Sequence, residues 1–405
     1  MLIDQVSTTT VYDYTGDLSG EWPVEIGGSP YTIGTRHSYS GEPIQQATSY
    51  TGEHLEALGL DVEYHQWSGS TYPNVIAERP GNAQPGDVYL ICGHLDDMPT
   101  GAVAPGADDN ASGSVAVLVA ADILSQYQWD CTLRFALWTG EEQGLLGSKA
   151  YAQRAYNDGE NILGVLNLDM IAYNTPASSP EIELHANSGI APTLDLAQLF
   201  ADVVGAYNLN LNPEIIPNGT NRSDHAAFWT YGYTAILGIE DMSGDFNPRY
   251  HSTNDLLQYL DMPYYTDYVK ASVGTLAHMS GCLSPIQPPV AKFTYACDHL
   301  ACNFDASASH DLDGVIASYA WDFGDGHTAS GLAASNTYSA AGTYRVTLTV
   351  TDNEALTGAQ GQDITVTGVP DSVHVGDLDG SRNANKKFWR ATVAIAVHDA
   401  GHNPL

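Results

Sequence analysis

Three short segments of this 405-residue chain combine histidine with carboxylate side chains. They are Gly93–Asp96 (GHLD), Gly106–Gly113 (GADDNASG) and Thr139–Glu142 (TGEE). Zinc accepts this mixture of imidazole nitrogen and carboxylate oxygen as ligands. A bound metal lowers the pKa of water, and a neighbouring carboxylate can then take up the proton. The three segments therefore predict hydrolysis by a metal-dependent enzyme.

The first two segments offer an imidazole and a carboxylate that two metals could share. His94 is the first candidate ligand, and Asp96 stands where it could accept the other imidazole N–H and fix the tautomer. The alternative is a surface histidine beside a solvated carboxylate. Asp109 is the candidate bridging carboxylate, but spacing alone does not separate it from Asp108.

The third segment carries two adjacent carboxylates, Glu141 and Glu142. In an extended segment they cannot both point the same way. One could bind metal while the other accepts a proton from water. Taken alone, such a pair is more typical of a helix start.

Further candidates lie later in the chain. Asp169 ends an apolar run, and a buried carboxylate is costly unless it is paired or coordinated. The alternative is a helix N-cap. His251 completes a set of five ligands, and Tyr250 before it could donate to a developing oxyanion. A polar cluster, Arg222–His225, precedes an aromatic pair.

The elements that must position these residues alternate between strands and helices. The expected strands are residues 62–67, 75–77, 88–92, 133–138 and 162–169, and the expected helices are residues 44–58, 115–124 and 145–156. This order predicts an α/β fold with a mostly parallel mixed sheet flanked by helices. Functional groups in such folds collect at the carboxyl ends of the strands, where the candidates above fall. The small residues of Ala111–Gly113 let the following helix begin close to the site.

The composition changes after Cys282, which predicts more than one domain. We assign residues 1–284 to the α/β domain and the proline-rich residues 285–289 to a linker. Residues 290–368 contain short alternating strands typical of an immunoglobulin-like β-sandwich. Residues 369–405 are too short for an independent core and are interpreted as the start of a third β domain or a tail.

In combination, the motifs identify a resemblance that covers roughly Val6 to Leu283. This part resembles the secreted bacterial dizinc aminopeptidases of leucyl-aminopeptidase type, which are related to glutamate carboxypeptidases and glutaminyl cyclases. The segments that carry the resemblance are, in chain order, GHLD, APGADDNASG, WTGEEQGLLGS, NLDM, RSDH and YHSTND.

The resemblance implies a role for each candidate. It implies that His94 and Asp169 hold one zinc, that Glu142 and His251 hold a second, and that Asp109 rather than Asp108 is shared. It further implies Glu141 as general base and Tyr250 as oxyanion donor. Arg222 matches an arginine that helps to arrange the pocket for the substrate's terminal amine, and Asp224 beside it is expected to bind substrate.

Residues 290–366 look like a polycystic-kidney-disease (PKD) domain, through Trp321–Gly326 (WDFGDG) and His310–Gly314 (HDLDG). Such domains accompany secreted peptidases, so we expect this one to contact surfaces or substrate. Asp311 and Asp313 could hold calcium; the alternative is a solvated turn.

The expected function is a metallo-aminopeptidase acting on the N-termini of peptides or proteins, with a metal-bridged hydroxide and Glu141 as base. Two zinc ions are expected, and use of cobalt or manganese is open. The alternatives are a glutaminyl cyclase-like acyltransferase with one zinc, a non-catalytic surface-binding protein on the same fold, and a carboxypeptidase. The walls of the substrate pocket are expected around Phe228, Trp229 and Phe246.

The net charge and the cysteine content indicate which partners and which cellular environment to expect. Forty-eight Asp and Glu against 14 Lys and Arg give a net charge of −34, which argues against nucleic acid and anionic membrane partners. No apolar run reaches the ~18 residues of a membrane span. Cys297 and Cys302 predict a disulfide, with free thiols as the alternative, whereas the pairing of Cys92, Cys131 and Cys282 is open. The polar N-terminus lacks a signal-peptide profile, and we expect a secreted protein whose signal peptide has been removed.

Overall fold

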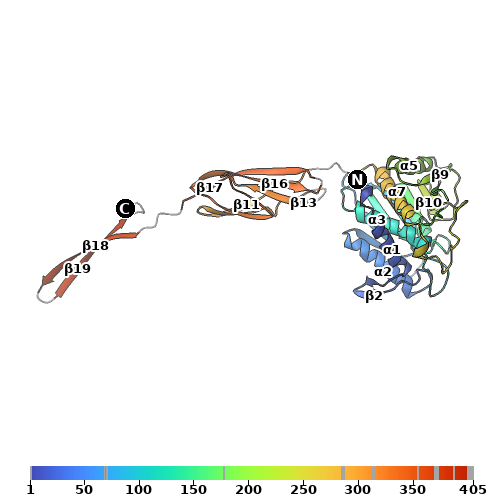
Figure 1. Ribbon diagram of the computed structural model, residues 1–405, viewed down its shortest axis with the longest axis horizontal. Helices are drawn as coiled ribbons and strands as arrows, with labels where there is room; N and C mark the ends of the chain where they lie inside the picture. The colour runs from blue at the N-terminus through green and yellow to red at the C-terminus, as the bar shows by residue number, and fades with distance from the viewer. Residues whose placement is uncertain are drawn as a thin grey trace. The chain divides into compact units, whose positions relative to one another are not determined.

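The computed structural model describes residues 2–67, 69, 72–176, 178–283, 288–311, 315–353, 355–368, 374–385 and 388–398. The chain divides into two compact units, Met1–Pro285 and Ile286–Leu405 (Figure 1). No helix in the described part of the chain is both long and apolar enough to cross a bilayer.

Within the described residues, the first unit is built on an eight-stranded mixed sheet with the strand order β3-β4-β6-β5-β7-β10-β8-β9. Parallel pairings join β5 to β6, β5 to β7, β7 to β10 and β8 to β9, and the remaining pairings are antiparallel. The predicted fold class is therefore confirmed. The strands are β3 (Asp61–His65), β4 (Asn74–Arg79), β5 (Gln84–His94), β6 (Cys131–Trp138), β7 (Asn161–Leu168), β8 (Glu181–His185), β9 (Asn212–Ile216) and β10 (Ala235–Glu240).

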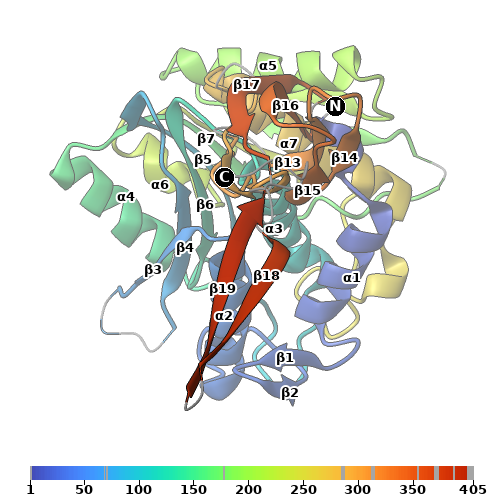
Figure 2. The same cartoon turned by 90° about the vertical axis from the view of Figure 1, so that its left-hand side faces the viewer.

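Helices cover both faces of this sheet. Figure 2 shows α4 (Leu146–Asp158) and α6 (His225–Trp229) on one side and α1 (Thr8–Ser19), α3 (Gly113–Leu124) and α7 (Met262–Ser280) on the other. The remaining elements are α2 (Glu42–Ala57), α5 (Pro192–Ala206), the hairpin β1 (Val24–Ile26) and β2 (Ser29–Tyr31), and the short helices η1 (Leu2–Gln5), η2 (Ala107–Ser112) and η3 (Leu257–Tyr259).

The central strands are apolar because both of their faces are buried. On β5, Ile91 packs in the larger hydrophobic cluster with α3 and α7, whereas Leu90 and Cys92 pack in the cluster with α4 and α6. On β6, Phe135 packs in the larger cluster and Trp138 packs in the cluster with α4 and α6. This alternation explains why these segments read as continuous apolar runs.

Glycine allows β5, β7 and the start of α3 to approach one another. A Cβ atom on Gly93 would lie 2.9 Å from the carbonyl oxygen of Leu168 and 3.1 Å from the carbonyl carbon of Gly113. A Cβ atom on Gly113 would also collide with the Leu168 oxygen. The expectation that small residues bring this helix close to the strand ends is confirmed.

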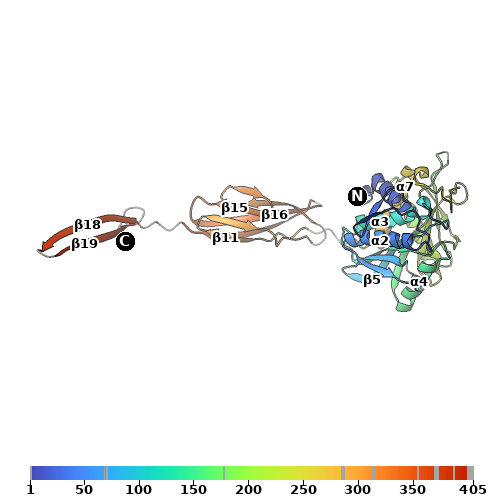
Figure 3. The same cartoon turned by 90° about the horizontal axis from the view of Figure 1, so that it is seen from below.

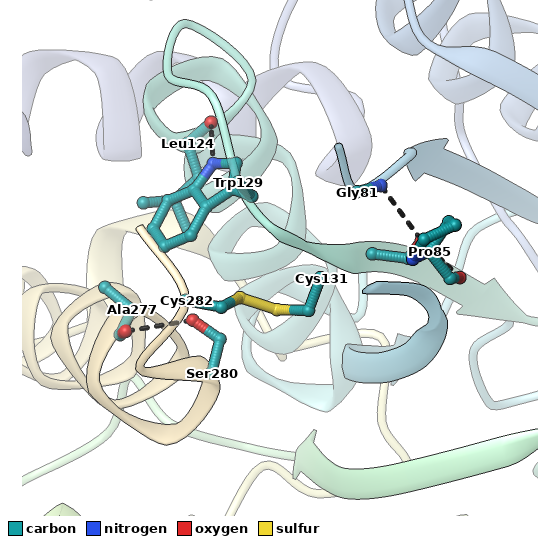
Figure 4. The surroundings of a disulfide bond; sticks show 9 residues. Gly81, Pro85, Leu124, Trp129, Cys131, Ala277, Ser280 and Cys282 are labelled. Atoms are coloured by element: carbon teal, nitrogen blue, oxygen red, sulfur yellow. Dashed lines mark hydrogen bonds between the residues drawn. A yellow bond between two sulfur atoms is a disulfide. The ribbon is translucent and has the colours of Figure 1, made fainter. Parts of the chain in front are cut away.

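A disulfide joins Cys131, at the start of β6, to Cys282, just after α7 (Figure 4). Beside it, the backbone N–H of Asp130 donates to the carbonyl of Cys282 at 2.7 Å, and the Trp129 indole donates to the carbonyl of Leu124 at 2.8 Å. Cys92 is a buried free thiol. Because the bonded cysteines are 151 residues apart, the bond restricts the unfolded chain strongly.

The second unit contains two antiparallel sheets, ordered β11-β12-β15 and β14-β13-β16-β17, whose strands lie side by side in Figure 3. Trp321, Phe323 and Phe304 form the centre of its core, and the predicted disulfide between Cys297 and Cys302 is confirmed. The calcium prediction involves Asp313, which lies outside the described residues. The strands are β11 (Thr294–Asp298), β12 (Ala301–Asp305), β13 (Ile316–Asp322), β14 (Thr328–Ser330), β15 (Ala333–Thr337), β16 (Gly342–Asp352) and β17 (Thr357–Val366), followed by an antiparallel pair, β18 (His374–Asn385) and β19 (Phe388–His398).

Candidate metal centre

The structure brings the five predicted metal ligands together at the carboxyl ends of the central strands of the sheet. Ligand atoms of His94, Asp109 and Asp169 lie within 4.8 Å of one another, and so do those of Asp109, Glu142 and His251. Asp109 belongs to both groups. The five side chains therefore form two adjoining clusters that share one carboxylate.

The two oxygens of Asp109 face opposite ways. Its Oδ1 lies 3.4 Å from Nε2 of His94, which in turn lies 3.3 Å from Oδ1 of Asp169. Its Oδ2 lies 3.2 Å from Nε2 of His251, which lies 2.9 Å from Oε2 of Glu142. Each oxygen thus belongs to a different cluster, which is the arrangement that a carboxylate bridging two cations requires.

The topology of the sheet accounts for the first cluster. His94 is the last residue of β5, and Asp169 directly follows β7, the neighbouring parallel strand. Parallel neighbours end at the same edge, so the two side chains meet there. Glu142 follows β6, whereas Asp109 lies in η2 and His251 in the loop before η3, so these two depend on loop packing.

Hydrogen bonds to neighbouring segments fix the position of the loop that carries Asp109. The backbone N–H groups of Asp108 and Asp109 donate to the carboxylate of Asp255, with the Asp109 bond at 2.9 Å. The Asp108 carboxylate is turned away from the centre, where it accepts from the backbone N–H of Ala172 at 2.9 Å and from Nδ2 of Asn247 at 2.8 Å. The structure therefore distinguishes the two aspartates that spacing left open.

Asp96 acts differently from the prediction. The backbone carbonyl of Asp96, not its carboxylate, accepts from Nδ1 of His94 at 3.0 Å, and the carboxylate lies 3.8 Å away. The carboxylate accepts instead from the backbone N–H groups of Glu141 at 3.1 Å and Glu142 at 3.4 Å, and from the Ser38 hydroxyl at 2.9 Å. The Asp96 carboxylate, in the segment just after β5, therefore orients the backbone of the glutamate pair.

Glu141 lies on the His94 side of the centre. Ligand atoms of His94, Glu141 and Glu142 lie within 4.8 Å of one another. Burial raises the pKa of Glu141 well above its usual range, and the charges of Asp224 and Asp169 act in the same direction, although His94 opposes them. A carboxyl group with a raised pKa at this position is suited to accept and return a proton.

Negative charge dominates the electrostatics of the site. Burial, followed by the charge of Asp109, raises the pKa of Glu142 to about 8. Burial lowers the pKa of His251, but the close contacts of its imidazole with the carboxylates of Asp109 and Glu142 outweigh this effect and raise the pKa to about 10. For His94, burial again lowers the pKa, and the charges of Asp169 and Glu141 raise it well above the usual range. The carboxylates thus attract any positive charge offered to them.

The donor set fits bound cations. Among the described residues, Asp109 Oδ2, Glu142 Oε1 and His251 Nε2 are buried polar atoms that make no hydrogen bond. Buried polar atoms normally have a partner, and buried carboxylates are costly without one. Two divalent cations on either side of Asp109 would satisfy these atoms with ligands that zinc accepts.

A cavity of about 560 Å³ opens onto this centre. The carboxylates of Asp109, Glu141, Glu142 and Asp169 are among the groups that line it. Tyr250 also lines it and is stacked on His251, with the ring centroids 3.6 Å apart. An apolar wall of the cavity is formed by residues that pack together in one hydrophobic cluster: Met170, Leu237, Ile239, Met242 and Phe246.

Only part of this apolar wall could be predicted from the sequence. Phe246 lines the cavity as expected, but Phe228 is fully buried between α6 and the sheet, and Trp229 lines a different cavity. Met170 and Leu237 were missed because apolar residues next to buried strands look like ordinary core residues.

The two predicted substrate-binding residues lie apart. Arg222 lines the cavity and is exposed. Asp224 is not among the residues that line the cavity and is fully buried at the start of α6. Burial raises the pKa of Asp224 to about 7. The charge of Asp224 also contributes to the raised pKa of Glu141.

Comparison with known families fits this geometry. Residues 74–273 match the model of peptidase family M28, and residues 284–367 match that of the PKD domain. The part of the chain that carries the candidate metal centre is therefore similar to peptidase family M28. The M28 domain is followed by a PKD domain, which confirms the expected pair.

Several curated proteins are similar to the M28 part. A probable leucine aminopeptidase of Arthroderma otae is 29% identical over 252 residues, which are 59% of this chain and 64% of the relative. A probable leucine aminopeptidase of Trichophyton verrucosum is 30% identical over 218 residues, 51% of this chain and 57% of the relative. A probable zinc metalloprotease of Pyrenophora teres is 28% identical over 51% of each chain. The chain spans between 51% and 64% of the length of these relatives.

Solved structures share the fold. The Legionella pneumophila LapA aminopeptidase superimposes with a TM-score of 0.60 at 17% identity, covering 70% of this chain and 72% of that one. The glutaminyl cyclase of Bacteroides thetaiotaomicron has a TM-score of 0.53 at 17% identity, covering 67% of this chain and 98% of that one. At these identities the likeness concerns the fold alone.

Proposed function

We propose that this chain is a zinc aminopeptidase with two metal ions, which removes N-terminal residues from peptides and proteins. The observation that carries the proposal is the carboxylate of Asp109, whose two oxygens face two separate pairs of ligands. His94 and Asp169 would hold one ion, and Glu142 and His251 the other. The names of the curated relatives support both the metal and the reaction.

Each residue of the candidate site has a separate role in the proposed reaction. Bound divalent cations would supply Lewis acidity and lower the pKa of water. Glu141 takes the proton from the attacking water and delivers it to the leaving amine. Tyr250 donates its hydroxyl hydrogen to the oxyanion that develops at the scissile carbonyl. Asp96 keeps Glu141 in place through the backbone hydrogen bond of 3.1 Å.

The cavity accounts for the direction of cleavage and the class of residue removed. Its carboxylates attract the α-ammonium group of a substrate, and Arg222 at its edge arranges the pocket for that group. The apolar wall formed by Met170, Ile239 and Phe246 accepts an apolar first side chain. Leucine is therefore a suitable N-terminal residue.

We further propose that the protein acts outside the cytoplasm and that its PKD domain contacts surfaces or substrate. The two disulfides support an oxidising environment. The net charge of −34 supports a soluble protein that does not bind nucleic acid.

The proposal is tested by the variant Glu141→Gln, assayed on leucine p-nitroanilide. We expect kcat to fall by at least about a thousandfold, because the base is lost, while plasma emission spectrometry still finds about two metal ions per chain. Glu214→Gln, on the exposed part of β9, removes the same charge far from the centre and should behave as wild type. Retained turnover in Glu141→Gln contradicts the base assignment. One metal per chain, together with cyclisation of N-terminal glutamine, favours the acyltransferase instead.

A further inference from the structure

A second cavity, of about 730 Å³, adjoins the candidate metal centre. Leu145, Thr220 and Asn221 line both cavities, so the two share a wall. The second cavity extends from this wall towards α4 and α6. Its other lining residues are Lys149, Ala186, Asn187, Asn218, Gly219, Ala226, Trp229 and Thr230.

The two cavities differ in charge. Four carboxylates line the first, whereas none of the described residues lining the second is an Asp or Glu. This difference is notable in a chain with 48 acidic residues and only 14 lysines and arginines. Lys149 is the charged residue among those that line the second cavity.

Lys149 has capacity to bind a ligand. Its Nζ donates one hydrogen bond, to the carbonyl of Gly144 at 2.9 Å, and an ammonium group has three donors. Within the described part of the chain, Lys149 forms no ion pair, unlike Lys270, which pairs with Asp267 at 3.0 Å. The side chain of Lys149 is exposed on the first turn of α4.

Amide groups add further donors. The side-chain oxygen of Asn187 accepts from the backbone N–H of Gly189 at 2.9 Å, and that of Asn218 accepts from the Ser188 hydroxyl. With their oxygens engaged, both residues can direct an NH₂ group to a ligand. The cavity is therefore suited to carbonyl and carboxylate oxygens.

The shared wall is fixed in position. The backbone N–H of Gly219 donates to the carbonyl of Ala186 at 2.9 Å, and that of Thr220 donates to Nδ1 of His185 at 3.1 Å. The carbonyl of Thr220 accepts from Nε2 of His225 at 2.8 Å. These bonds tie the wall to β8 and α6, so the second cavity does not depend on a free loop.

We propose that the second cavity receives the part of a peptide that follows the scissile bond, and that Lys149 makes it selective for a carboxylate there. The inference rests on the proposed aminopeptidase function. The acidic cavity would hold the positively charged N-terminus, and the adjoining cavity would hold the opposite charge further along the peptide. The carboxylate is either the C-terminus of a tripeptide or an acidic third side chain.

The test compares kcat/KM for matched peptides that separate these two sources. Leu-Ala-Ala is compared with Leu-Ala-Ala-amide for the terminal carboxylate, and Leu-Ala-Glu-amide with Leu-Ala-Gln-amide for the side chain. Each comparison gives a ratio in which folding and basal activity cancel. Each ratio is kcat/KM for the peptide with the carboxylate divided by kcat/KM for its uncharged counterpart. In Lys149→Met at least one of these two ratios should fall about three- to fivefold, as expected for the loss of an exposed charge pair. Lys149→Glu should lower that ratio further.

Lys270→Met is the control, because it removes the same charge from α7, and both of its ratios should equal those of the wild type. Ratios that are unchanged in Lys149→Met, or lowered equally in Lys270→Met, overturn the inference while leaving the aminopeptidase function intact. If the wild type cleaves none of the four peptides, the result contradicts the proposed function and this inference with it.

Discussion

The two halves of the candidate metal centre are built in different ways. The inner half, His94 and Asp169, stands on the ends of neighbouring parallel strands, and its side chains are 2% and 11% exposed. The outer half, Glu142 and His251, stands on loops, and the His251 side chain is 32% exposed. The sheet therefore sets the geometry of the inner half, whereas loop packing must set that of the outer half.

The outer half is nevertheless supported. The Asp96 carboxylate accepts from the backbone N–H of Glu142 at 3.4 Å, and Tyr250 stacks on the ring of His251. Asp255, four residues after His251, binds the backbone beside Asp109 and so connects this loop to the bridging residue. We infer that the outer half binds metal less tightly, because an exposed ligand on a loop is less preorganised.

Asp109→Asn should have the largest effect, because it removes the carboxylate on which both halves depend. We expect kcat/KM on leucine p-nitroanilide to fall at least about a thousandfold and the metal content to fall from about two ions per chain to one or fewer. Asp108→Asn is the matched control. It should retain both ions and lose only about 1–3 kcal/mol of stability, from one broken buried hydrogen bond. The opposite pattern would identify Asp108 as the bridge.

His94→Ala and His251→Ala compare the halves directly. His94→Ala leaves buried carboxylates unpaired, so we expect it to lower the free energy of unfolding by about 3–5 kcal/mol. His251→Ala should cost about 1 kcal/mol, because this imidazole is partly exposed, and should keep about one metal ion per chain. Denaturant titration and plasma emission spectrometry measure both quantities. Equal losses in the two variants would show that the halves are not distinct.

A further comparison concerns the pH dependence of the metal-free protein. The folded state raises the pKa of Glu142 from 4.5 to about 8 and that of His251 from 6.5 to about 10, so both groups bind protons more tightly than in the unfolded chain. Their stabilisation is complete below the unfolded pKa values and is lost as the pH rises through 8 and 10. The melting temperature of the metal-free protein should therefore fall between pH 6 and 9.

Zinc provides the control for this scan. Bound cations take the place of the protons, so saturating zinc should reduce the slope of melting temperature against pH. A metal-free protein that is more stable at pH 9 than at pH 6 would contradict the crowding of carboxylates at the centre.

The same difference between halves explains what the sequence could predict. His94 and Asp169 follow apolar strands, and parallel topology brings strand ends together, so their meeting could be argued from the strands alone. The sequence also places Glu142 after an apolar strand, but the choice of Glu142 rather than Glu141 as ligand needed the family resemblance. His251 needed it as well, because nothing in the loop sequences indicates where the loops pack. Spacing does not separate Asp109 from Asp108. The family resemblance favours Asp109, and the contacts of each carboxylate distinguish the two residues.

Other features depend on tertiary packing that local sequence does not contain. Asp224 is polar and lies beside Arg222, yet α6 packs it into the interior, whereas Arg222 stays at the surface. The partner of Cys131 is 151 residues away, so no local signal could identify it. The charge difference between the two cavities likewise arises from residues of several separate segments, and spacing along the chain does not reveal it.

The most direct test of the central claim is the anomalous scattering of crystals grown with zinc and measured at the zinc absorption edge. The account predicts about two peaks, about 3.5–4 Å apart, on either side of the Asp109 carboxylate, with ligand atoms at about 2.0–2.2 Å. One peak should contact His94 and Asp169, and the other Glu142 and His251. A single peak, or peaks that Asp109 does not connect, would contradict it.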